Sequence, residues 1–209
     1  KFHLYTSCEA TGKHSEYIRD GLDYQQWKRN LKRIGTEANI EGLHVMMTIN
    51  SLCLFSIHHF LDEIYEMKKD PNCKSPMVSL NLLRFPSFQS PLALPDHIKD
   101  YLRINLATWY EEAKTRELWH EGERASIERL IDYLEVVDAP HRRTSDKDLL
   151  WKDFKTFYKE YDLRRNKSIT VFPKILTDWL ETIPDTVTGY QPLNSGDGTN
   201  IDEPLAKYD

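Results

Sequence analysis

Three short polar clusters stand out because each follows an apolar run that is typical of a buried strand. They are Ser7-Cys8-Glu9, Thr48-Ile49-Asn50-Ser51 and Arg84-Phe85. Ligands of parallel α/β sheets collect at the carboxyl ends of the strands, so a hydroxyl, a carboxylate, an amide and a guanidinium would converge there. Such a set could bind a polar small molecule that has a ribose and an amino-acid end. The alternative is that these are ordinary loop-start residues that satisfy free backbone groups.

Arg19 is a second candidate, because an arginine can hold a carboxylate through two parallel hydrogen bonds. It follows the predicted first strand in a loop that also contains Glu16 and Asp20. A salt bridge with one of these neighbouring acids is the alternative. Cys8 could be a nucleophile, but a small buried packing residue is the better interpretation.

Other polar residues favour structural roles. Glu121 and Glu123 are interpreted as solvated acids in the first turn of a helix, where the helix dipole favours negative charge. The eight histidines are scattered or point to different helix faces, so they predict no metal site. The chain has no glycine-rich phosphate loop, nucleophile elbow or H-E-x-x-H motif.

Composition narrows the classes of protein further. The net charge is −5 and no long basic run occurs, so nothing points to nucleic acid. The longest apolar run is far too short to span a membrane, and we expect no membrane partner. The three cysteines are odd in number and widely spaced, which fits a reducing cytoplasm and excludes a local zinc or iron–sulfur loop.

The first half of the chain predicts alternating strands and helices. Strands are expected over 2–8, 43–49 and 77–83, with a helix after the Asp23 cap and another that ends near Asp70-Pro71. Strands of this length alternating with helices are typical of β-α-β units with a parallel sheet. The predicted fold class is therefore α/β.

The second half predicts helices only. The proline-rich run 85–95 ends the first part, and Asp96 is expected to cap the first of four helices. The expected organisation is an α/β part over 1–95, a helical extension over 96–184 and a flexible polar tail over 185–209.

Three segments together resemble the radical S-adenosylmethionine family. They are the run from Phe2 through Cys8 to Asp23, the segment Leu82-Leu83-Arg84-Phe85-Pro86, and Tyr161-Asp162-Leu163-Arg164-Arg165-Asn166. The resemblance spans roughly residues 2 to 184 and is to the carboxy-terminal half of members with a shortened SPASM-like ("twitch") extension. It implies that 2–8, 43–49 and 77–83 are the fourth to sixth strands of a partial (β/α) barrel.

The resemblance also implies roles for single residues. Ser7 and Asn50 look like ribose contacts, Arg19 looks like the partner of the methionyl carboxylate, and Leu83-Arg84 looks like the segment beside the adenine. Glu9 belongs to the same cofactor-binding set. In the whole family the cofactors are S-adenosylmethionine and a [4Fe–4S] cluster. The cluster cysteines would lie in the other half of the barrel, so we expect no cofactor bound to this chain alone.

Three functional hypotheses follow from these residues. The first is a fragment of a radical S-adenosylmethionine enzyme that contributes part of the cofactor and substrate pocket and is inactive alone. The second is a non-catalytic binding or interaction module built on the half barrel. The third, ranked last, is an independent enzyme that uses Glu9, Arg19 or Cys8.

The predicted half barrel also has a consequence for assembly. The strand over 2–8 should lie at an open sheet edge, and such edges are usually covered by another chain, a loop or a helix. We expect a homodimer that covers this edge, with the helical second half as the competing cover.

Overall fold

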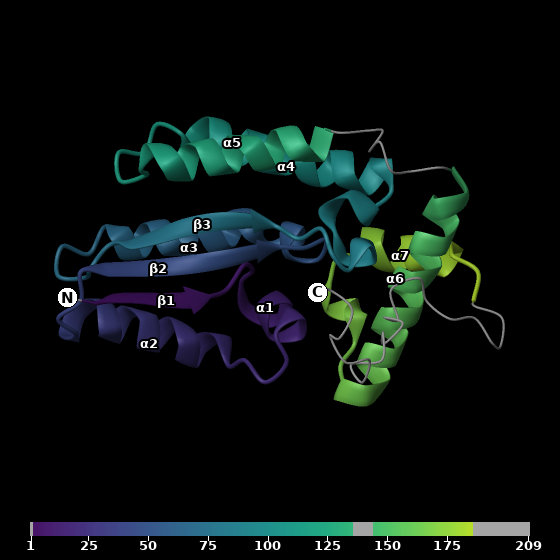
Figure 1. The fold of residues 1–209 in the computed structure, drawn as a ribbon, viewed down its shortest axis with the longest axis horizontal. Helices are drawn as coiled ribbons and strands as arrows, with labels where there is room; N and C mark the ends of the chain where they lie inside the picture. Colours follow the sequence, from purple (N-terminus) through teal and green to yellow (C-terminus); the bar gives the residue numbers. More distant parts are fainter. Residues whose placement is uncertain (1, 136–143, 186–209) are drawn as a thin grey trace, which may run out of the picture.

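The computed structural model describes residues 2–135 and 144–185 and shows a mixed α/β fold (Figure 1). Its three strands form one parallel sheet in the order β1-β2-β3. The strands are β1 (His3–Ser7), β2 (Gly42–Ile49) and β3 (Pro76–Leu82). The predicted fold class is confirmed at this level, and β1 lies at a sheet edge as the sequence predicts. The predicted polar tail lies outside the described residues, apart from Asp185.

Helices connect the strands and then continue the chain. Between the strands lie α1 (Gly12–Ile18), α2 (Tyr24–Glu37) and α3 (Ile57–Lys68), and after them come α4 (Asp96–Ala113), α5 (Glu121–Glu135), α6 (Thr144–Arg165) and α7 (Lys174–Thr182). The Asp23 side chain caps α2 by accepting a hydrogen bond from the Gln26 backbone N–H at 2.8 Å. The Asp96 prediction was off by one residue, because Asp96 is the first helical residue and Pro95 is the cap.

The sequence prediction missed α1. It is only seven residues long and begins at Gly12, whose φ is +53°, so no apolar repeat of helical period marks it. Glu16, expected in a loop, therefore lies in a helix, and Arg19 is the residue that ends it.

The core lies between the sheet and the helices that follow each strand. The alternate residues Leu43, Val45, Met47 and Ile49 of β2 are buried, and their neighbours His44, Met46 and Thr48 are half-buried or exposed. In Figure 1, α3 lies behind the sheet, and no described helix crosses the face turned to the viewer. The sheet therefore has one packed face and one open face, and Tyr5, 62% exposed, and Met77 belong to the open one.

The helical second half covers two other sides of the sheet. In Figure 1, α4 and α5 lie along the β3 side, and α6 and α7 lie beyond the end toward which the strands point. At that end the Tyr17 ring of α1 packs against Tyr158 and Tyr161 of α6 and against Phe172. The extension thus packs against α1 at the carboxyl end of the sheet and leaves the open face uncovered.

A buried carboxylate attaches α5 to the β3 edge. Glu123 accepts hydrogen bonds from the Lys68 ammonium at 2.9 and 3.0 Å, from the Val78 backbone N–H at 2.8 Å and from the His120 backbone N–H at 3.0 Å. The interpretation of Glu123 as a solvated acid is wrong, because only 2% of the residue is exposed. Its position in the first turn of α5 was predicted correctly, but the carboxylate turns inward to pair with Lys68.

Arg129 of α5 adds a second bond to the same edge, from its guanidinium to the Leu80 carbonyl at 3.1 Å. Val78 and Leu80 are the β3 residues whose backbone groups point away from β2, since the intervening residues face β2 in the parallel ladder. Side chains of α5 therefore take the place of a further strand. Within the described residues no helix combines the length and apolar character that crossing a membrane requires.

Replacing Glu123 by Gln tests this attachment. The variant leaves the Lys68 ammonium buried without a counter-charge, so we expect a loss of about 3–5 kcal/mol in the free energy of unfolding. Urea denaturation followed by circular dichroism measures it. Glu121→Gln, an exposed acid in the same helical turn, is the matched control and should cost less than about 1 kcal/mol. Equal losses in the two variants would contradict the role given to Glu123.

Candidate functional site

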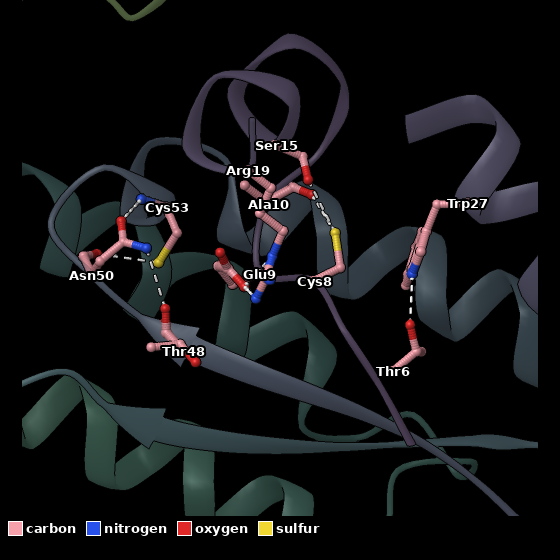
Figure 2. Close-up of polar contacts among 10 residues, drawn as sticks. All are labelled: Thr6, Cys8, Glu9, Ala10, Ser15, Arg19, Trp27, Thr48, Asn50 and Cys53. Atoms are coloured by element: carbon pink, nitrogen blue, oxygen red, sulfur yellow. Dashed lines mark hydrogen bonds and ion pairs between the residues drawn. The ribbon is translucent and has the colours of Figure 1, made fainter. Parts of the chain in front are cut away.

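The candidate site lies where β1 and β2 end, beside α1 (Figure 2). Glu9 follows β1 and is 2% exposed. Its Oε2 accepts hydrogen bonds from the Arg19 guanidinium at 2.6 and 3.2 Å, and the carboxylate also takes a backbone hydrogen bond from Thr48 of β2. This one carboxylate therefore joins the end of β1, the end of α1 and strand β2.

Two opposing effects act on the pKa of the Glu9 carboxyl. Burial raises this pKa, and the hydrogen bonds and positive charge of Arg19 lower it. Burial is the larger effect, so the pKa is raised overall. Arg19 thus has a partner inside the fold. That partner is neither Glu16 nor Asp20, the acids nearest in sequence: Asp20 pairs with Arg165 and Lys167, and Glu16 accepts from the Tyr24 backbone N–H.

Asn50 shapes the turn after β2. Its Oδ1 accepts hydrogen bonds from the backbone N–H groups of Leu52 and Cys53, both at 2.9 Å, and its Nδ2 donates to the Thr48 carbonyl at 3.2 Å. The amide therefore holds the turn that leads into the short 3₁₀ helix η1 (Cys53–Phe55), by accepting from backbone groups two and three residues on. The side-chain amide bonds only to backbone groups of neighbouring described residues, which is the loop-start role that the sequence left open.

The remaining predicted site residues lie at the ends of β1 and β3. The Leu83 backbone N–H donates to the Ile49 carbonyl at 2.9 Å, which extends the β2–β3 ladder by one bond. Arg84 is exposed, and its guanidinium forms no hydrogen bond or ion pair with another described residue. Ser7 is the exposed last residue of β1. The structure thus brings Glu9, Arg19 and Asn50 together around Thr48, and it leaves the side chains of Ser7 and Arg84 available.

Sequence reasoning missed one further exposed polar position on the open face, Asn81 of β3. It is the register partner of Thr48 of β2, which belongs to a cluster that the sequence singled out, and both residues are exposed. The period of two along the predicted strands carried this signal, because both residues alternate with buried apolar ones. With Ser7 and Tyr5 they make the open face polar and aromatic toward its carboxyl end.

The cysteines of the site are buried and protonated. Burial raises the pKa of the Cys8 thiol to about 11, although a hydrogen bond with Ser15 at 3.1 Å opposes the shift. Burial also raises the pKa of Cys53 well above its ordinary value, and its thiol donates to the Asn50 carbonyl at 3.1 Å. A thiolate is the reactive form of cysteine, so neither residue has the environment of a nucleophile.

No family model, curated protein or solved structure matches the chain. The chemistry that can be assigned therefore rests on the residues themselves. The described part of the chain brings no group of three His, Cys, Asp or Glu side chains together as a metal site would. The buried groups at the strand ends, namely the Glu9–Arg19 ion pair, the Asn50 amide and the protonated thiols, thus have structural roles. The exposed polar side chains lie beside them.

Alkylation tests the state of the thiols. With iodoacetamide at pH 8, the folded protein should remain unmodified at Cys8 and Cys53 because both thiols are buried and protonated, whereas the urea-unfolded chain should gain three adducts. Intact-mass spectrometry over time gives the count, and peptide mapping gives the site. Modification of native Cys8 at the rate of the unfolded chain would restore the interpretation of Cys8 as a nucleophile.

Proposed function

We propose that this chain is the carboxy-terminal half of a partial (β/α) barrel of the radical S-adenosylmethionine type, with a twitch-like helical extension. It would work in the cytoplasm as part of a larger enzyme and contribute one wall of the cofactor and substrate pocket. One observation carries the proposal: a three-stranded parallel sheet is packed by helices on one face and is open on the other. The inner face of half a barrel has this character.

The residues divide into two roles in this proposal. Ser7 and Arg84 have exposed side chains at the carboxyl ends of the two outer strands, so they would contact the ribose and the adenine. Glu9, Arg19 and Asn50 would hold the backbone of the strand ends in place. The direct contact between Arg19 and a methionyl carboxylate is weakened, because Glu9 already occupies the guanidinium on its Nε and one Nη atom.

The [4Fe–4S] cluster does not fit the described part of this chain. Each of the three thiols is buried, and each contacts a backbone carbonyl: Cys8 that of Ala10, Cys53 that of Asn50, and Cys73 those of Lys32 and Lys74. Cluster ligation needs several thiolates around one point. In this proposal the ligands come from a segment outside residues 1–209, and the chain alone is inactive.

A binding or interaction module is the second candidate, and a specific observation favours it. Glu9, Arg19 and Asn50 satisfy one another or the backbone, which leaves few polar groups for chemistry. The open edge of β1 remains as a surface for another polypeptide.

Titration with S-adenosylmethionine separates the two candidates. Half a pocket covers only half of the ligand, so we expect binding weaker than about 10 μM, roughly −7 kcal/mol, by calorimetry. Saturation-transfer NMR at millimolar ligand should still detect contact with the adenosine protons. Arg84→Ala should weaken this binding about fivefold, for the loss of a contact worth about 1 kcal/mol.

Arg33→Ala is the matched control, because Arg33 is an exposed arginine on α2, away from the strand ends, and its removal should leave binding unchanged. No saturation transfer at millimolar ligand would reject the cofactor role and leave the interaction module. Binding tighter than about 10 μM would show that the chain holds a whole pocket and would contradict the half-barrel proposal.

A further inference from the structure

The two edges of the sheet differ in whether their outward-pointing backbone groups are hydrogen-bonded. On β3 the outward backbone groups at Val78 and Leu80 are bonded by Glu123 and Arg129 of α5. On β1 no side chain or strand in the described part of the chain hydrogen-bonds to the outward-pointing backbone groups. An unpaired row of N–H and C=O groups is a template for another strand.

The ladder shows which β1 groups are free. The Cys8 N–H donates to the Met46 carbonyl, and the Phe2 carbonyl accepts from the Glu41 N–H, so the even-numbered residues of β1 face β2. In a parallel ladder the residues between them point the other way. His3, Tyr5 and Ser7 therefore present both their N–H and their C=O groups to the open edge.

The side chains along this edge carry none of the usual protection. The strand His-Leu-Tyr-Thr-Ser contains no Lys, Glu, Asp or Pro, the residues that block edge pairing. The Tyr5 ring stacks on His44 of β2 with ring centroids 4.6 Å apart, which holds it over the sheet. The backbone of Tyr5 thus stays accessible at the edge.

From this geometry we propose that β1 pairs with β1 of a second copy, antiparallel, around a two-fold axis at Tyr5. In that register Tyr5 faces Tyr5 of the second copy, and His3 faces Ser7 in both directions. All three are hydrogen-bonded pairs with two bonds each, so every free group at His3, Tyr5 and Ser7 is satisfied. Two three-stranded sheets become one continuous sheet.

Charge favours a second copy as the occupant. An isologous pairing places each side chain beside its own kind or its symmetry partner, so a charged strand would repel itself. Here the cross-strand neighbours are Tyr with Tyr and His with Ser, and no like charges meet. The inference rests on the backbone of β1 and concerns residues 1–209 on their own, because the other half of the proposed barrel would pair along the same edge.

Light scattering after gel filtration at micromolar concentration tests the assembly. The chain has a mass of 24.7 kDa, and we expect a species of twice that mass. Tyr5→Lys places two ammonium groups side by side at the two-fold axis and should yield the monomer. Met77→Lys adds the same charge to the same open face but two strands away, so it should leave the dimer intact. A monomeric wild-type chain, or equal loss of the dimer in both variants, would overturn the proposal.

A cysteine cross-link tests the register and traps even a weak dimer covalently. Hydrogen-bonded residues in an antiparallel pair have Cα atoms about 5.5 Å apart, within the range for a disulfide. Tyr5→Cys should therefore oxidise to a covalent dimer, whereas Met77→Cys should not, and the buried native cysteines should stay reduced. Equal cross-linking of the two variants would reject the pairing at Tyr5.

Discussion

The buried carboxylate of Glu123 holds three parts of the fold at one point. It neutralises Lys68 at the end of α3, bonds the outward N–H of Val78 in β3 and caps the first turn of α5 through His120. A buried charge is tolerated only when it is paired and hydrogen-bonded, and here every partner is fixed by a different element. This constraint fixes the helical extension beside β3, and so determines which side of the sheet stays open.

With the β3 edge closed, the open face and the β1 edge define what the chain can do. The buried residues at the strand ends stabilise the fold. Glu9 and Arg19 form an ion pair, and Asn50 hydrogen-bonds the backbone of the turn that it begins. The exposed groups are Ser7, Thr48, Asn81 and Arg84, on or beside a sheet that stops after three strands. A cluster-bearing half barrel and a second copy of the chain would compete for the same edge, so the dimer is the expected state of residues 1–209 on their own.

Much of the fold was predictable, because apolar periodicity marks each strand and each long helix. The strands were placed within one residue of their observed ends, and Asp23 capped α2 as expected. The failures have physical reasons. The α1 helix is too short to show a period, and Glu123 looks like any first-turn acid, because its partner Lys68 lies far away in sequence.

The sequence predicted where the candidate residues lie, and the roles given to them stay predictions. Parallel strands bring their carboxyl ends together, so Ser7, Glu9, Asn50 and Arg84 were found at one end of the sheet. Sequence alone could not show that Arg19 would pair with Glu9 and not with the acids nearer to it in sequence, because that pairing depends on the burial of Glu9 in the fold. The ribose, adenine and carboxylate contacts remain proposals that rest on resemblance.

Amide hydrogen exchange measured by NMR at several protein concentrations tests the unequal edges directly. The Val78 N–H is bonded to a buried carboxylate, so it should exchange slowly at every concentration. The Tyr5 N–H should exchange rapidly in dilute solution and become protected as the concentration rises and β1 pairs with a second copy. Rapid exchange at Val78, or protection of Tyr5 at all concentrations, would contradict the account of one closed edge and one open edge.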